Sequence, residues 1–208
     1  GADIRSTARA VVPLFMTGHT DLARKAIDGI LDHQDCDRQS LTYGNFRWYS
    51  GWKTARDPNA ASFIVPHLWY VHRNCRDDLE VPRQQRLEAA LSMTLEGLNA
   101  HRATWEYTNI AILNMASKLC IADILGDVRA RKIAYWDWDE WRNHVARLGF
   151  LPEYNSPNYT SVQAHGLAIM LDCEADSDVH REVLSVLRHL LTSLVLDYHE
   201  VIGLPTGA

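Results

Sequence analysis

Residues 3–34 read DIRSTARAVVPLFMTGHTDLARKAIDGILDHQ, and this stretch has the pattern of two amphipathic helices joined by a tight turn. Apolar residues recur at helical spacing on both sides of the turn, which predicts helices over residues 3–16 and 20–34. Between them, Gly18 closes the first helix, and Asp21 lies at the positive end of the second. The stretch therefore predicts an antiparallel helical hairpin.

The same helical spacing continues through the rest of the chain, and no convincing period-two run is longer than four or five residues. Further helices are predicted near residues 59–75, 82–102, 107–125, 128–148, 160–174 and 177–199. Tight turns and longer connections alternate between these helices, which makes four hairpins. Because a hairpin cannot bury its apolar stripe alone, the hairpins must stack sideways. The predicted fold is all-α, with stacked antiparallel helical hairpins forming an incomplete α/α toroid.

The length of 208 residues is that of one ordinary domain, so residues 1–208 are predicted to form a single toroid-like domain of about four hairpins. The formal net charge of −5 gives no general attraction to phosphate backbones, and nucleic acid is not an expected partner. No apolar run approaches the roughly 20 residues that a bilayer requires, so no membrane partner is expected either. The compartment cannot be read from this sequence.

Cysteine and histidine spacing argues against a metal site. Cys36, Cys75, Cys120 and Cys173 have no short metal-ligand spacing, and they are predicted to be reduced thiols in the core. The ten histidines contain no His-x-x-x-His or His-Glu-x-x-His pattern. We therefore predict no metal and no cofactor.

The long connection over residues 35–58, DCDRQSLTYGNFRWYSGWKTARDP, is unusually rich in aromatic and basic residues. Aromatic rings can stack on sugar faces, while Arg and Lys hold carboxylates. The candidate substrate-binding residues here are Arg47, Trp48, Tyr49, Trp52 and Lys53. The alternative is a loop that folds back as a plug, with its two tryptophans buried.

A second cluster of candidate residues occupies residues 153–166, EYNSPNYTSVQAHG, at a loop-to-helix junction. Tyrosine or histidine can remove a proton from a carbon acid, and a nearby tyrosine can return one to a leaving oxygen. The candidates are Glu153, Tyr154, Asn155, Asn158, Tyr159 and His165. Since Tyr159 and His165 are six residues apart, they meet only if Tyr159 still belongs to the loop. The alternative is that the tyrosines pack under the loop and His165 lies in the core.

Asn109 is predicted in the first turn of the 107–125 helix, at the end where backbone N–H groups favour anions. Its amide could hydrogen-bond a substrate carboxylate. Alternatively, Thr104 or Thr108 caps this helix, and Asn109 has no role beyond the first turn.

Residues 135–144, YWDWDEWRNH, place Trp138 and Trp141 on one helical stripe, which predicts core packing. Asp137, Asp139 and Glu140 are predicted to form a solvated face or to pair with Arg142.

Residues 108–127, TNIAILNMASKLCIADILGD, followed by residues 148–171, LGFLPEYNSPNYTSVQAHGLAIML, resemble the α/α-toroid domain of polysaccharide lyases of the heparinase and chondroitin-lyase type. The resemblance implies that an acidic oligo- or polysaccharide is cleaved by β-elimination. It implies that Asn109 neutralises the uronate carboxylate, that Tyr159 or Tyr154 transfers a proton, and that His165 is a base. It also implies that Arg47 positions the substrate.

Two other classes of function compete with the lyase. A glycoside hydrolase on an α/α frame needs two carboxylates, for which Glu153 is the candidate acid and Asp57 or Asp137 its partner. A non-catalytic helical scaffold would use the aromatic loops as anchors for another protein.

The last predicted helix is apolar over a wide arc, with Leu184, Leu187, Leu191 and Leu194 at three-and-four spacing. Family toroids have more hairpins and then a β-sheet domain, whereas this chain has four. The pattern predicts that a homodimer contact or a missing C-terminal region covers this helix.

Overall fold

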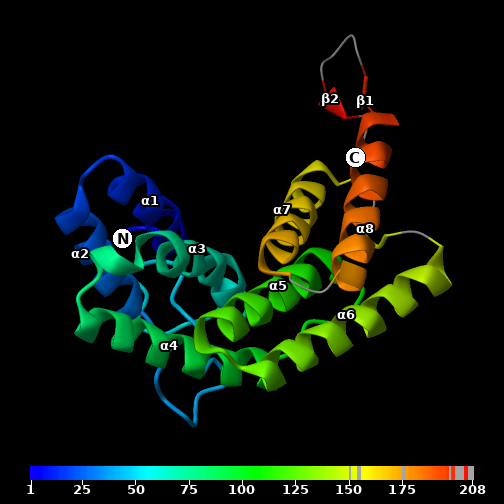
Figure 1. The fold of residues 1–208 in the computed structure, drawn as a ribbon. Helices are drawn as coiled ribbons and strands as arrows, with labels where there is room; N and C mark the ends of the chain where they lie inside the picture. The colour runs from blue at the N-terminus through cyan, green and yellow to red at the C-terminus, as the bar shows by residue number, and fades with distance from the viewer. Residues whose placement is uncertain (150, 154–155, 175–176, 197, 200–203, 206–208) are drawn as a thin grey trace. The chain divides into compact units, whose positions relative to one another are not determined.

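The computed structural model of the chain describes residues 1–149, 151–153, 156–174, 177–196, 198–199 and 204–205. Within these residues the fold is all-α, as predicted, and the helices follow one another as Figure 1 shows. The helices are α1 (Ile4–Met16), α2 (Thr20–Leu31), α3 (Ala60–Cys75), a short 3₁₀ helix η1 (Arg76–Asp78), α4 (Val81–Ala100), α5 (Thr108–Leu125), α6 (Val128–Leu148), α7 (Pro157–Cys173) and α8 (Ser177–Leu196). The two-residue strands β1 (Tyr198–His199) and β2 (Leu204–Pro205) pair antiparallel.

The chain forms two compact units. The first comprises residues 1–102 and 120–130, and the second comprises residues 103–119 and 131–208. The 35–58 loop belongs to the first unit and the 149–160 segment to the second. Three predictions therefore stay untested: that the chain is a single domain, that its hairpins form an incomplete toroid, and that these two loops share a cleft.

The first unit is centred on α1, which packs against both α2 and α3. Ile4, Ala8, Val11 and Phe15 form the buried stripe of α1. The helix begins after Asp3, whose Oδ1 accepts hydrogen bonds from the N–H groups of Arg5 at 3.0 Å and Ser6 at 3.2 Å. These features follow directly from the amphipathic pattern of the first hairpin.

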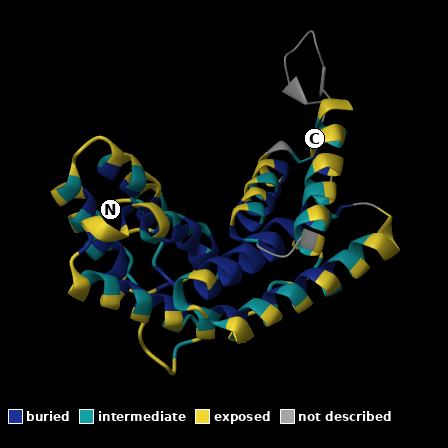
Figure 2. Ribbon diagram, in the orientation of Figure 1, coloured by how far each residue is buried: buried dark blue, intermediate teal, exposed yellow. Residues whose placement is uncertain are grey.

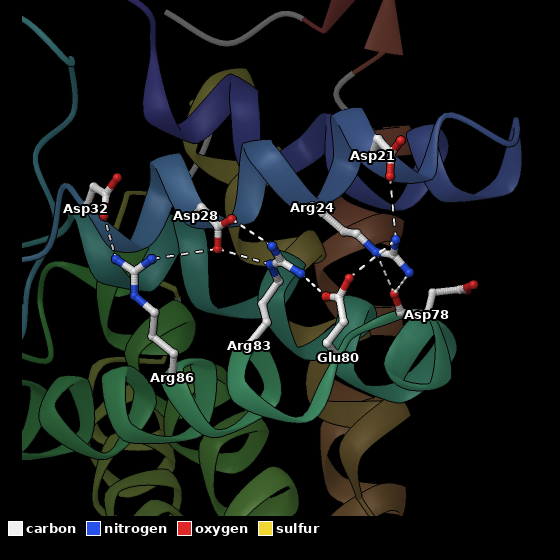
Figure 3. Close-up of polar contacts among 8 residues, drawn as sticks. All are labelled: Asp21, Arg24, Asp28, Asp32, Asp78, Glu80, Arg83 and Arg86. Atoms are coloured by element: carbon white, nitrogen blue, oxygen red, sulfur yellow. Dashed lines mark hydrogen bonds and ion pairs between the residues drawn. The ribbon is translucent and has the colours of Figure 1, made fainter.

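Charged side chains join α2 to η1 and α4, as Figure 3 shows for eight residues. The Arg83 guanidinium donates to both carboxylate oxygens of Asp28, at 3.0 and 2.9 Å. This bidentate contact raises the pKa of Arg83. Arg24 of α2 donates to the Asp78 carbonyl, and Arg86 pairs with Asp32. Arg24, Arg83 and Arg86 thus bond to groups of the chain itself.

The second unit contains residues 108–119 of α5, a strongly buried helix that Figure 2 shows in dark blue and whose last residues belong to the first unit. Gly166 of α7 lies close to α5, because a Cβ added there would be 2.7 Å from Ile112 Cγ2. Trp138 and Trp141 of α6 are both 0% exposed, and their rings stack with centroids 5.3 Å apart. The predicted core role of these two tryptophans is confirmed.

Asp137 differs from the prediction. The residue is 2% exposed, and its Oδ2 accepts a hydrogen bond at 2.8 Å from the Nζ of Lys118, a residue that is 1% exposed. The solvated face predicted for Asp137 is therefore wrong, because α5 supplies an opposite charge inside the core. Asp139 does lie near Arg142, with Oδ1 and Nη2 4.0 Å apart.

One helix in the described part of the chain, α5, is long and apolar enough to cross a membrane by length and composition. Because 83% of α5 is buried inside the structure, and a buried core helix of a soluble protein has the same length and composition, this helix is weak evidence for a membrane span.

The four cysteines, all among the described residues, form no disulfide, and Cys75, Cys120 and Cys173 are buried as predicted. Cys36 is exposed, so its predicted place in the core is wrong. It follows α2 in the 35–58 loop rather than lying on a helix face.

On α8, Val183 and Leu190 are buried, whereas Leu191, Val195 and Leu196 are 44%, 71% and 79% exposed. The C-terminal turns of this helix thus carry uncovered apolar side chains, and a partner that covers them stays a prediction.

Candidate functional site

A polar pocket of about 270 Å³ lies in the first unit, between the end of α2 and the 35–58 loop. Two of the predicted substrate-binding residues, Arg47 and Lys53, line it. The other lining residues are His33, Gln34, Asp35, Cys36, Asp37, Ser40, Thr54 and Ala55.

Backbone pairing brings the two sides of this pocket together. Because α2 ends at Leu31 rather than at residue 34, the next residues are free to pair with a later part of the loop. The Arg47 N–H donates to the His33 carbonyl at 3.0 Å, and Gln34 forms a bridge with Phe46. This pairing makes His33 and Arg47 neighbours although 13 other residues separate them in the chain.

Arg47 is half-buried, and its guanidinium donates only to backbone carbonyls. Nη1 donates to Trp52 at 2.7 Å, and Nη2 donates to Asp32, the residue that ends α2, at 3.1 Å. Among the described residues, Arg47 has no ion pair with a carboxylate. These bonds hold the loop, and they leave the positive charge and three N–H groups of Arg47 available to an anion.

The ring of His33 has a defined orientation. Its Nδ1 lies 2.6 Å from the Gly29 carbonyl oxygen. Because a carbonyl only accepts, Nδ1 must carry the hydrogen, and Nε2 is then the accepting nitrogen of the neutral ring. In this form Nε2 of His33 can accept a proton, as a general base must.

Asp35 and Asp37 add carboxylates to the pocket. The Asp35 carboxylate accepts hydrogen bonds from Ser40 Oγ and Thr42 Oγ1, both at 2.6 Å, and from the Asp37 N–H at 3.1 Å. Burial alone would raise the pKa of Asp35, but these bonds outweigh it and hold the pKa below its ordinary value. The pocket therefore offers both cations and anions to a ligand.

The aromatic residues of the loop differ in their surroundings. Trp48 packs against Phe63 with ring centroids 5.4 Å apart, and the Arg5 guanidinium lies 4.2 Å from its ring. The plug alternative predicts that both tryptophans are buried, but Trp48 and Trp52 are only half-buried, so that alternative is not confirmed. Tyr49 is 40% exposed and meets Trp52 edge-on at 5.3 Å. Their rings remain candidates for stacking on a ligand.

In the second unit, Asn109 and Glu153 come together. The Asn109 N–H donates to Glu153 Oε2 at 2.9 Å, and the Thr108 N–H also bonds this carboxylate. The Asn109 side chain turns back, since its Oδ1 accepts from the Ile110 N–H at 2.8 Å. A carboxylate does lie at the N-terminus of α5, but it is supplied by the chain itself.

The helix α7 begins at Pro157, three residues before the predicted start. Asn158 and Tyr159 therefore belong to the helix, and the condition under which Tyr159 would meet His165 is not fulfilled. Tyr159 is 44% exposed, and His165 is also exposed, so the core alternative for His165 is wrong. Tyr154 and Asn155 lie outside the described residues.

His33, Asp35 and Cys36 line the pocket but were not predicted from the sequence. Three acidic residues, a histidine and a cysteine lie within residues 32–37, DHQDCD, directly after an amphipathic helix. That density was the available signal, but the helix was predicted to run past His33.

The described residues contain no group of three or more His, Cys, Asp or Glu side chains placed to hold a metal ion. No family model matches the chain, and no curated protein or solved structure is significantly similar to it.

Proposed function

We propose that this chain is a carbohydrate-active protein that binds a uronate-containing glycan in the pocket of the first unit and cleaves it by β-elimination. The single observation that carries the proposal is the Arg47 guanidinium, which is fixed by two backbone carbonyls and bonds no carboxylate of the described residues. A uronate carboxylate is a ligand of matching charge and planar geometry. Lys53 adds a second positive charge to the pocket. Tyr49 and Trp52 do not line the pocket but belong to the same loop, and their rings can stack on a sugar that extends beyond it.

The same pocket offers the groups that elimination needs. With the uronate carboxylate neutralised by Arg47, His33 Nε2 would take the proton from C5. The electron pair would form the C4–C5 double bond, the C4–O bond would break, and the leaving oxygen would take a proton from Lys53 or water. His33 is thus a third candidate base in addition to Tyr159 and His165. Of the three, His33 is the one that lines the same pocket as Arg47.

We expect Arg47→Gln to weaken binding of a uronate oligosaccharide by about tenfold to a hundredfold, because a hydrogen bond to a charged group contributes about 1.5–3 kcal/mol. Lys53→Gln should weaken binding by about two- to fivefold, since an exposed ion pair is worth up to about 1 kcal/mol. Isothermal titration calorimetry measures both effects.

The matched control is Lys25→Gln, which removes the same charge from an exposed position of α2 outside the pocket. Its affinity should equal that of the wild type. Equal affinity loss in Lys53→Gln and Lys25→Gln would mean that net charge rather than the pocket binds the glycan, and an unchanged affinity in Arg47→Gln would refute the site.

A second candidate function is glycoside hydrolysis with Glu153 as general acid. Burial raises the pKa of the Glu153 carboxyl above its ordinary value, although the N–H groups of Asn109 and Thr108 and the nearby Gln163 amide act in the opposite direction. A raised pKa suits a proton donor. Incubation with uronate glycans separates the two reactions, because elimination leaves an unsaturated uronide at the new end and hydrolysis leaves none.

A further inference from the structure

The N-terminus of α5 is occupied by a carboxylate from a distant part of the chain. Glu153 lies 44 residues after Asn109, and its Oε2 accepts the Asn109 N–H at 2.9 Å, with the Thr108 N–H as a second donor. Free backbone N–H groups and the helix dipole make such an end favourable for an anion. In this structure Glu153 fills that role.

Glu153 is held there in an unfavourable conformation. Its φ is +61°, and among the described residues it is the only non-glycine residue with a positive φ. Side chains with a Cβ rarely adopt this left-handed region. Burial also raises the pKa of its carboxyl, so the ionised group is less stable here than in water. Glu153 is therefore an internal ligand that another carboxylate can compete with.

A buried donor beside Glu153 is left without a good acceptor. Gln163 of α7 is 1% exposed, and its Nε2 has no hydrogen bond of good geometry with the described residues. The Gln163 side chain nevertheless lies close enough to the Glu153 carboxyl to lower its pKa. Since unbonded buried donors are costly, this amide indicates a place for an oxygen that Glu153 does not reach well.

We infer that the N-terminus of α5 is a binding site for a small carboxylate, formed by the N–H groups of Thr108 and Asn109 and by the Gln163 amide, which Glu153 occupies until an external carboxylate displaces it. A free carboxylate is not tethered to a strained backbone, so it can orient its two oxygens toward all three donors. This site lies in the second unit and does not depend on the pocket around Arg47.

The test uses Glu153→Gly, because glycine adopts a φ of +61° without strain and removes the internal carboxylate. We expect sodium acetate to raise the Tm of this variant relative to sodium chloride at equal ionic strength, and to shift the Thr108 and Asn109 amide signals in ¹⁵N-resolved NMR spectra. The wild type should bind acetate at least about tenfold more weakly, since Glu153 competes. Equal responses to acetate and chloride in Glu153→Gly would overturn the inference.

Gln163→Leu in the Glu153→Gly background is the matched control, and it should weaken acetate binding by about tenfold through loss of one donor. If Glu153→Gly does not fold, Glu153→Gln keeps an acceptor for the Asn109 N–H and removes only the charge. Acetate should then still shift the two amide signals, and their failure to move would count against the site.

D-Glucuronate and D-glucose identify the source of the carboxylate. Tighter binding of glucuronate than of acetate assigns a sugar acid as the ligand, and equal binding assigns a simple carboxylate. Binding of glucose as strong as that of glucuronate would contradict a carboxylate site. Arg47→Gln should leave the acetate- and glucuronate-induced shifts of the Thr108 and Asn109 amide signals unchanged, because these signals report only the site at α5, so failure of this inference and failure of the proposed function can be told apart.

Discussion

Asp137→Asn is expected to lower the free energy of unfolding by about 3–5 kcal/mol, because it removes a buried negative charge that is paired with the Lys118 ammonium inside the second unit. Both side chains are almost fully buried, and Nζ and Oδ2 are 2.8 Å apart. A buried ammonium that loses its opposite charge is no longer fully compensated for its lost hydration. Urea unfolding followed by circular dichroism measures the change.

Two further variants decide whether the pair itself is responsible. Asp139→Asn, on the same helix but with a side chain 61% exposed, should change stability by no more than about 0.5 kcal/mol. The double variant Lys118→Met with Asp137→Leu should recover most of the loss, since a buried ion pair can often be replaced by apolar residues of similar volume. A loss below about 1 kcal/mol in Asp137→Asn would show that the buried charge is compensated elsewhere.

Gly97→Ala is expected to destabilise the first unit by about 2–3 kcal/mol, although alanine is the better helix former by roughly 1 kcal/mol. A Cβ on Gly97 would lie 2.2 Å from the Tyr43 carbonyl oxygen, so α4 and the 35–58 loop would have to separate. Gly44 faces the same constraint from the loop side, with a φ of +77° and a Cβ position 2.2 Å from the Met93 carbonyl oxygen.

The control for Gly97→Ala is Gly29→Ala in α2, where an added Cβ meets no atom within 4 Å. This variant should gain up to about 1 kcal/mol from helix propensity alone. Thermal unfolding of both proteins gives opposite signs if close approach of the loop decides the effect. Stabilisation by Gly97→Ala would mean that the loop does not press on α4.

The helices could be predicted well because each depends on its own residues. Asp3 caps the start of α1, Gly18 separates α1 from α2, and apolar spacing marks the faces of both helices that become buried. The start of α7 was missed because Pro157 suits a first helical turn as well as a loop. That shift moved Tyr159 out of the loop and separated it from His165.

The candidate sites were only partly predictable. Arg47 and Lys53 were identified from the composition of their loop, and they do line one pocket. His33 joined them only through backbone pairing across the loop, which no local pattern announces. The shared cleft with Tyr159 required knowledge of how distant segments meet, and it stays a prediction.

The sequence by itself determined the all-α class, the order of the helices and the burial of Trp138 and Trp141, since periodicity and capping are properties of neighbouring residues. Only the tertiary structure decided that Asp137 pairs with Lys118 and that Glu153 caps a helix that begins 45 residues earlier. The charge of a side chain can be read from its letter, but its partner is decided by packing between helices. The stability and the acidity of that side chain depend on the partner.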